Sequence, residues 1–515
     1  MSTIHQHRDP EKAVVNGVEE KPQTTLQEDV AAYGLEKVYE RHGRIDLIPL
    51  PSDDPQDPLN WASWRKHLVL IQVAFAAMMG PFSAAATIPS FESFVEDFNV
   101  SITQASYSVS IVIIFLGVFP LIWAPVANRI GRRPVLLASF LISSMMHVAG
   151  GYTNSYGAMM TTRVFQGIFL SPAQSLGGNM ASEMFFLHEK GAKMGIWTLF
   201  TSLGPPVAPF IMGFVQYHTG IWRWTFFVLA IINAVQFLLY LFLGPETLFD
   251  RVDRSDPATV QVMQEHPTAW WRPYFTFKRW GSAPWSQVPI EIVRPLGMFA
   301  KMNVFLPTLS YGLLFSYTNV LMTVEIPALL SRKAGLNAQQ TGLNFLGAII
   351  GACLGEIIAG RVSDLYMMWR TRKAGGERDS VWRLPFALPG YLLGAVGVII
   401  FGVQLQNMQE GHWNVTPIVG VAIAVFSLQL VTTTTYAFAV ESQPPHLAGR
   451  VPPFISFLRQ LQAFVAPFYL SLPFEEWGNA KAAGLYAGLA GGIGIITTVL
   501  CMVYGRKWRN RDVSA

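Results

Sequence analysis

The sequence predicts an all-α polytopic membrane protein with twelve transmembrane helices. Hydrophobic residues make up 51% of its 515 residues and charged residues 14%, whereas soluble domains carry about 25% charged residues. The apolar residues gather in runs such as Leu68–Gly80, Val109–Val126 and Ala487–Val503. Each run lies in a stretch of about 20 residues or more, the length that a helix needs to cross a bilayer. A water-soluble chain would expose several of them as large apolar patches.

The predicted helices follow one another along the chain with short polar breaks between them. They are residues 66–90, 103–127, 134–154, 157–182, 191–216, 222–244, 298–323, 340–364, 384–404, 414–440, 450–472 and 482–505. Glycine and proline are tolerated inside such helices because neighbouring helices satisfy the freed backbone groups. The polar segment 245–297 is predicted to be a cytosolic linker between the six helices of 66–244 and the six of 298–505.

The two tails are predicted to be cytosolic. Residues 1–65 are rich in Asp, Glu, Gln and Pro and are expected to be disordered. They contain no short apolar region near Met1, so no signal peptide is expected. Residues 506–515 form the second tail, which is basic.

Lys and Arg are distributed unevenly over the short loops, and this distribution predicts the orientation. The loops after the second, fourth and eighth helices and the C-terminal tail are basic, whereas 91–103, 153–156 and 405–413 contain no Lys or Arg. Arg223, Arg332, Lys333 and Lys481 are exceptions to the pattern. Both termini are therefore expected in the cytosol, with the protein in the plasma membrane.

Two acceptor sequons agree with this topology. Asn99-Val100-Ser101 and Asn414-Val415-Thr416 both fall on the predicted outer side, so Asn99 and Asn414 are expected to be glycosylated. Trp61 and Trp64, next to Arg65 and Lys66, are expected to form an interfacial anchor.

A basic turn follows the second predicted helix and reads Asn128-Arg129-Ile130-Gly131-Arg132-Arg133-Pro134. A tight turn needs Gly131, and the basic residues suit an anionic cytosolic leaflet. These residues can bridge helix ends and hold the cytosolic side closed, or they can serve as simple positive-inside anchors.

Two further patterns favour the gating role. The same place in the second half, after the eighth helix, reads Gly360-Arg361-Val362-Ser363-Asp364 and continues with a basic run to Lys373, so the halves echo each other. The fourth helix contains Arg163-Val164-Phe165-Gln166-Gly167, which places a charge inside an apolar helix.

At these motifs the chain resembles the major facilitator superfamily. Asn128–Pro134 is similar to its loop motif, with Asn128 in place of the usual acid, and Arg163–Gly167 is similar to the helix-4 motif linked to proton coupling. The resemblance covers about residues 55–510. It implies two six-helix bundles around a central cavity, with the substrate near the midplane and alternating access by rocking of the halves.

Further segments resemble the fungal drug:proton antiporter branch of that superfamily. Gly204-Pro205 is similar to the start of the antiporter motif, although Ala208 and Pro209 stand where glycines are usual. Pro245-Glu246-Thr247-Leu248 and Asp57-Pro58-Leu59-Asn60-Trp61 are similar to sequences that flank the first six helices in fungal members.

Ionisable groups inside a membrane are costly, so each is a functional candidate. Arg163 lies in the outer half of the fourth helix and is expected to face the cavity or to pack beside the first helix. Arg459, near Gln460 and Gln462 in the eleventh helix, either holds an anionic substrate or acidic partner, or caps a polar network. Glu325 ends the seventh helix and is either an outer-gate residue or a solvated side chain.

Other candidates are polar groups at a depth where they can face a cavity. Interhelical hydrogen bonds of under about 1 kcal/mol are the alternative role for them. The same choice between cavity wall and packing applies to several aromatic residues, and His147 is expected to be a hydrogen-bonded packing residue. The substrate or proton-coupling candidates are Gln166, Asn319, Asn344, Gln429 and Tyr107, and the aromatic ones are Phe315, Tyr317, Phe426, Tyr436 and Phe438.

Three acids near the cytosolic ends of helices resemble the superfamily's acids that pair with loop arginines. They are Glu183, Glu356 and Glu441, and a structural or gating role is expected for them. With them belong the motif residues Asn128, Arg129, Gly131, Arg132, Arg133, Gly204, Pro205, Gly360 and Asp364.

Several function classes are not supported. The chain has no phosphate loop of the Gly-x-x-x-x-Gly-Lys-Ser/Thr type and no Cys/His cluster, and Cys353 and Cys501 both fall inside apolar runs. We therefore expect no cofactor, no metal and no enzyme activity. Lys plus Arg total 37 against 33 for Asp plus Glu, an excess too small to indicate nucleic acid.

The sequence favours a proton-coupled exporter of a drug, toxin or secondary metabolite. Its expected partners are a small-molecule substrate, the lipid bilayer and protons, and no partner chain is needed. Glu325 is the favoured titrating group. The alternatives are a proton-coupled importer of a nutrient or organic cation such as a polyamine, and a transporter-like sensor. The short tail after Arg506 speaks against the sensor. We expect Arg163→Ala to abolish transport and to leave surface expression intact.

Overall fold

The structure is a computed structural model that describes residues 47, 49, 51–52, 57–249, 284–374 and 379–514. Within these ranges every regular element is helical, as predicted. Most of the predicted disordered tail and the linker residues 250–283 lie outside the described residues.

The first half contains eight described α-helices, two of which are short. They are α3 (Ser63–Ala85), α4 (Phe91–Phe98), α5 (Ile102–Val118), α6 (Pro120–Ile130), α7 (Arg132–Gly151), α8 (Tyr156–Met184), α9 (Leu187–Thr219) and α10 (Arg223–Leu243).

The second half begins after the linker and is more interrupted. Its helices are α13 (Val288–Val293), α14 (Met302–Phe315), α15 (Leu321–Glu325), α16 (Arg332–Ala334), α17 (Ala338–Leu343), α18 (Leu346–Lys373), α19 (Ala387–Asn407), α20 (Thr416–Glu441), α21 (Pro445–Ala448), α22 (Val451–Val465), α23 (Pro467–Leu470), α24 (Leu472–Trp477) and α25 (Asn479–Ser514). Two π-helical segments, Ser316–Val320 and Ile326–Ser331, join α14 to α15 and α15 to α16.

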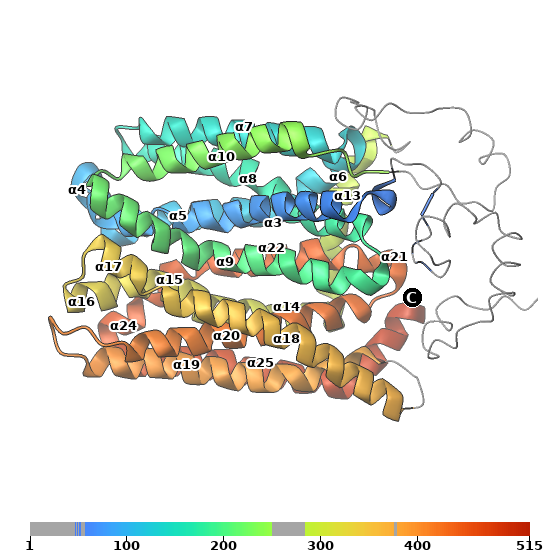
Figure 1. The fold of residues 1–515 in the computed structure, drawn as a ribbon. Coiled ribbons are helices and arrows are strands. Elements are labelled where there is room, and N and C mark those ends of the chain that lie inside the picture. Colours follow the sequence, from blue (N-terminus) through green and yellow to red (C-terminus); the bar gives the residue numbers. More distant parts are fainter. Residues whose placement is uncertain are drawn as a thin grey trace, which may run out of the picture.

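The helices form two layers whose members run side by side (Figure 1). One layer holds α3 to α10 and the other α14 to α25, so the two halves of the sequence are the two layers. We call the end that carries the α6–α7 turn the motif end, and the end that carries α4, α16 and α24 the opposite end. The C-terminus lies at the motif end. This arrangement confirms the two predicted bundles.

Nine helices of the described chain are long and apolar enough to span a membrane, and α5 with α6, bent by 46°, makes a tenth. The predicted spans 157–182 and 450–472 correspond to α8 and to α22 with α23, which fall short of that measure. α8 carries buried polar side chains such as Arg163 and Gln166. A helix enclosed by protein needs no apolar lipid-facing surface, which explains how α8 can be polar. The count of twelve is consistent with the structure without being fixed by it.

Two details differ from the predictions. The eighth helix is longer than predicted, because α18 continues through Gly360 and ends at Lys373 instead of near residue 364. The echo of the two halves is therefore one of sequence, with a turn in the first half and a continuous helix in the second. Trp61 is 6% exposed and packs in the first half's core, so only Trp64, 70% exposed, suits the predicted interfacial anchor.

The turn at Gly131 is confirmed. Gly131 has φ of 99°, a conformation that side-chain-bearing residues adopt at a cost. It ends α6 and lets α7 begin one residue later, with Arg132 and Arg133 in the first turn. The basic residues are thereby held at fixed positions between two helix ends.

Candidate functional site

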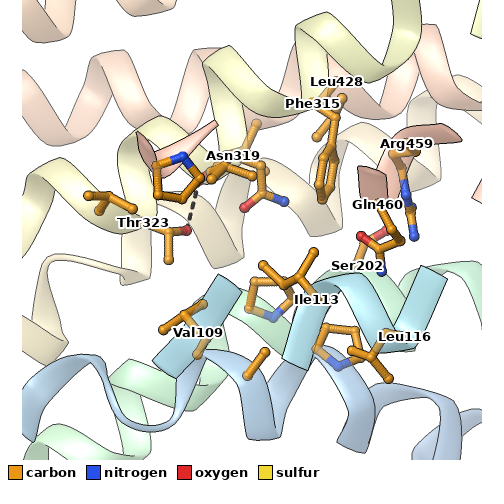
Figure 2. A pocket seen from close by; sticks show the side chains of 18 of the residues that line it. Val109, Ile113, Leu116, Ser202, Phe315, Asn319, Thr323, Leu428, Arg459 and Gln460 are labelled. Atoms are coloured by element: carbon orange, nitrogen blue, oxygen red, sulfur yellow. Dashed lines mark hydrogen bonds between the residues drawn. The ribbon is translucent and has the colours of Figure 1, made fainter. Parts of the chain in front are cut away.

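A cavity lies between the two layers, and both halves contribute its wall. α3, α5 and α9 supply one side, and α14, α15, α20 and α22 supply the other. The volume of this cavity is about 70 Å³. Figure 2 shows the apolar side chains Val109, Ile113 and Leu116 of α5 facing Phe315 and Asn319 of the second half.

Arg459 of α22 is the one charged residue among the described residues that line the cavity. One of its Nη atoms donates to the hydroxyl of Tyr311 at 3.1 Å, and its guanidinium lies 4.9 Å from the centre of the Phe315 ring. Its Nε is buried and has no hydrogen-bond partner. The cation is therefore held over an aromatic face with donor capacity to spare.

Amide and hydroxyl groups complete the polar part of the wall. Gln460 lies beside Arg459, and the Ser202 hydroxyl donates to Oε1 of Gln429 across the two halves at 3.5 Å. Asn319 lies in the π-helical segment Ser316–Val320, and its backbone carbonyl accepts from the Thr323 hydroxyl at 2.7 Å. Such π-helical segments often occur at functional sites.

Arg163 does not line the cavity. It is buried beside α3, which is one of the two placements that the sequence predicts. It is fully buried and donates to the carbonyls of Ser83 and Ala84 at 2.9 Å and of Ser108 at 3.0 Å. Gln166 accepts from it at 3.1 Å. No carboxylate of the described chain pairs with this cation.

The contacts of Arg163 have a plain cause in the end of α3. The last carbonyls of a helix lack intrahelical partners and carry the negative end of its dipole. Ser83 and Ala84 belong to the last turn of α3, so Arg163 caps that end. His147, fully buried, lies 2.8 Å from the Ser83 hydroxyl and 2.6 Å from the Ser143 carbonyl, as a packing residue would. The α3 end that Arg163 holds carries Ala84 and Ala85, which line the cavity.

Glu325 is 1% exposed, so the alternative of a solvated side chain is wrong. Its Oε1 accepts from the Ser471 hydroxyl at 3.0 Å, and neither of its oxygens forms a described ion pair. Glu325 does not line the cavity, but its neighbours Thr323 and Val324 do. Glu325 is thus buried beside the cavity with one hydroxyl as its partner. Ionisation of such a carboxyl would change its interactions with the side chains packed around it.

The remaining candidates are divided by the structure. Asn319, Gln429 and Phe315 lie in the wall of the cavity. Asn344 and Tyr107 do not: Asn344 accepts from the Trp413 indole at 2.9 Å, and the Tyr107 ring lies 4.9 Å from that of Phe468. The other aromatic candidates, which are also outside the lining, are Tyr317, Phe426, Tyr436 and Phe438.

Polar contacts at the motif end tie the basic turn to the helices around it. Arg132 forms a bidentate ion pair with Glu183 at the end of α8. The carboxylate of Glu246 accepts from the backbone N–H groups of Arg132 at 3.2 Å and Arg133 at 3.0 Å. A carboxylate at a helix N-terminus satisfies free N–H groups and meets the positive end of the dipole. The segment that begins at Pro245 therefore caps α7.

Arg129 is joined to the second half's leading segment. Its two Nη atoms donate to the carboxylate of Glu291 in α13 at 2.8 and 2.9 Å, and Arg129 is 3% exposed. The guanidinium holds the pKa of Glu291 below the usual range of a glutamate, chiefly through this hydrogen bond. Among the described residues, Glu291 of the linker is therefore the carboxylate that binds Arg129 of the basic turn.

The other gating candidates differ in their surroundings. Glu441 pairs with Arg383 at 3.2 Å, and Asn128 is exposed. Glu356 forms no described ion pair, and its Oε2 is buried without a hydrogen-bond partner, so the expected pairing with a loop arginine is not made. The side chain of Asp364 lies outside the described part. Gly204 allows α9 to approach α3, because a Cβ there would lie 2.8 Å from the Met78 carbonyl oxygen, and Pro205 lines the cavity.

Several cavity residues were not among the predicted candidates. Tyr311, Ser202, Thr201 and Gln460 all lie in the wall. In the sequence Gln460 stands out only as a neighbour of Arg459, and hydroxyl residues in helices are too common to indicate a site. For Thr201 and Ser202, the available signal in the sequence is their position within one helical turn before the motif Gly204-Pro205.

A multi-pass helical membrane protein whose two halves enclose a shared cavity has the design of a solute carrier. Residues 73–467 match the family model of the Major Facilitator Superfamily. The chain belongs to this superfamily.

Relatives and solved structures agree with this assignment. The chain is 24% identical to the cycloheximide resistance protein of Candida maltosa over 89% of this chain and 84% of that one. It is 26% identical to the MFS-type transporter penM of Penicillium rubens over 83% of each chain. Among solved structures, a D-xylose-proton symporter shares the fold with a TM-score of 0.60 and 15% identity, covering 85% of this chain and 97% of that one.

Proposed function

We propose that this protein exports a small organic molecule across the plasma membrane by alternating access. The observation that carries the proposal is the central cavity, because each half supplies part of one binding wall. A rocking motion of the halves would then expose the same wall to either side. Curated relatives include a cycloheximide resistance protein and a probable efflux pump, mfs2, of Aspergillus flavus, 24% identical over 83% of this chain.

Coupling to protons is part of the proposal, with Glu325 as the titrating group. A buried carboxyl with one hydroxyl partner changes its solvation strongly between its two charge states. Protonation of Glu325 would alter the contact between α15 and Ser471, next to cavity residues Thr323 and Val324. The MFS antiporter QDR3 of Candida albicans is 33% identical to this chain. The match covers 44% of this chain and 31% of QDR3.

The proposed orientation has both termini and the motif end in the cytosol, and the protein works as a monomer. Asn99, at the end of α4, and Asn414, before α20, are both exposed and belong to connections at the opposite end. That end would be extracellular, where glycosylation of both asparagines can occur.

A transport assay in sealed vesicles with an imposed pH gradient tests the proposal. Inside-out vesicles that contain the protein should accumulate a substrate when their lumen is acidified, and collapse of the gradient should stop accumulation. In cells, loss of the protein should raise retention of a toxic substrate. Lower accumulation of a labelled nutrient in such cells would instead indicate uptake and would contradict export.

A further inference from the structure

The chemistry of the cavity wall points to one class of substrate. Among the described residues that line it, Arg459 carries the one charge, and no Asp or Glu lies in the wall. The cavity therefore has a net positive charge in a setting of low dielectric constant. A cationic solute would meet repulsion there without a carboxylate to offset it.

Arg459 is prepared for an anion that the protein itself does not provide. It forms no described ion pair, since its one protein hydrogen bond goes to the neutral hydroxyl of Tyr311. Its Nε is buried and unpartnered, although buried polar groups are usually satisfied. A guanidinium presents paired donors whose spacing matches the two oxygens of a carboxylate.

The surroundings of Arg459 indicate what the rest of the ligand looks like. The Phe315 ring lies under the guanidinium, and the amide of Gln460 and the Ser202 hydroxyl lie near it at the same end of the cavity (Figure 2). Away from this end the wall consists largely of the side chains of Val109, Ile113 and other apolar residues. A ligand that matches this wall has a polar, acidic head and an apolar or aromatic body.

We infer that the substrate is an amphipathic organic acid, bound as its carboxylate by Arg459 with its apolar body against α5 and Phe315. This inference rests on the proposed function, because it takes the central cavity as the transport site. It also fits export: a membrane potential that is negative inside drives an anion outward, and exchange of one proton inward for one anion outward is driven further by the same potential. The polyamine alternative has no carboxylate in the wall to bind it.

Binding to the purified full-length protein in lipid nanodiscs tests the inference. The probes are 1-naphthylacetic acid, its primary amide and 1-naphthylethylamine, which share a ring system and are anionic, neutral and cationic at neutral pH. Decanoic acid, decanamide and decylamine form a second set. In each set we expect the acid to bind at least about tenfold more tightly than the amide, because charge-assisted hydrogen bonds are the stronger ones, and the amine to bind least.

Variants assign the preference to Arg459. Arg459→Gln should lose the preference for the acid and bind the amide as the wild type does, while Arg459→Lys should keep part of it. Arg332→Gln, which removes an exposed arginine of α16, is the matched control and should leave all affinities unchanged. Equal binding of acid and amide by the wild type, failure of both acids to bind, or an acid preference that survives in Arg459→Gln would overturn the inference.

The ranking of the probes by the wild type does not depend on the folding of any variant.

Failure of the proposed function would give a different experimental result from failure of the inferred ligand class. If the acids bind with the expected preference but proteoliposomes never move them, export is wrong and the ligand class stands. If the amide or the amine is transported and the acids are not, export stands and the ligand class is wrong.

Discussion

Two arginines that are costly to bury in a membrane helix have different roles in this protein. Arg163 and Arg459 are both cations in a membrane helix. Arg163 is saturated by three carbonyls, Gln166 and the Thr87 hydroxyl, whereas Arg459 keeps an unpartnered Nε in the cavity wall. The first is therefore a positioning residue for the end of α3, and the second is available to a ligand. Arg163→Ala would leave several buried carbonyls unpaired, each at a cost of about 1–3 kcal/mol. Surface expression should then fall together with transport, in contrast to the expectation from sequence.

Glu325 and Glu356 are two buried acids that a transport assay can tell apart. Glu325→Gln fixes the side chain in its neutral form, so we expect exchange of substrate across the membrane to persist and accumulation driven by a pH gradient to be lost. Glu356→Gln, the same change at a buried carboxyl that does not line the cavity, should keep driven accumulation. Uptake into acidified vesicles measures both. Driven accumulation in Glu325→Gln at the wild-type level would exclude Glu325 as the coupling group.

At the scale of single elements, the two motif glycines offer a matched comparison. Gly131 has φ of 99°, and Gly360 lies inside α18, where an added Cβ would meet nothing within 4 Å. Gly131→Ala should destabilise the protein by about 1–3 kcal/mol, because a side chain strains that backbone conformation. Gly360→Ala should be neutral or stabilising by up to about 1 kcal/mol, because alanine favours a helix. Thermal unfolding of the purified variants measures both effects, and equal midpoints would contradict the assigned turn.

The α13 segment is held to α6 by an ion pair whose strength depends on pH. Because Arg129 lowers the pKa of Glu291, the pair stabilises the docked segment fully above the pKa of a free glutamate, about 4.3. This stabilisation is lost as the pH falls through the lowered pKa of Glu291.

Hydrogen exchange of residues 284–293 should therefore be slow at neutral pH and should rise, beyond its intrinsic pH dependence, only at acidic pH. Glu291→Gln should raise exchange of this segment already at neutral pH, because a neutral amide cannot form the ion pair with Arg129. Exchange in the variant that matches the wild type throughout would show that other contacts hold α13.

At the scale of the whole molecule, the two halves meet closely at the opposite end. α9 and α17 cross there, and a Cβ on Gly213 would lie 2.6 Å from the carbonyl oxygen of Ala338 and 3.1 Å from Cα of Gly342. The Tyr107 ring of α5 also contacts the Phe468 ring of α23 at this end. Small residues allow such close approach of helix backbones in membranes. Alternating access requires these contacts to form and break.

Gly213→Ala should hinder closure at the opposite end and lower the transport rate several-fold, because the new methyl group meets backbone that cannot move aside locally. Gly488→Ala in α25, where a Cβ meets nothing within 4 Å, is the control and should transport normally. Initial rates in proteoliposomes at equal protein content measure the effect. A normal rate in Gly213→Ala would mean that this contact does not open and close in the cycle.

The sequence alone determined the class of the molecule and its main helices. Long apolar runs, the distribution of Lys and Arg, and the turn at Gly131 are local properties, so they can be read without knowing what packs against what. This is why the helical layers and the superfamily could be predicted, and why Arg163 and Arg459 could be marked as unusual.

Only the tertiary structure decided which of these marked residues share a cavity. Arg163 and Arg459 look alike in sequence, but the neighbours that satisfy one and leave the other open come from α3, α5 and α14, which are distant in the chain. The same holds for Glu291, whose partner Arg129 lies 162 residues away. Burial and partnership depend on contacts between remote segments, and a buried charge takes its role from those contacts.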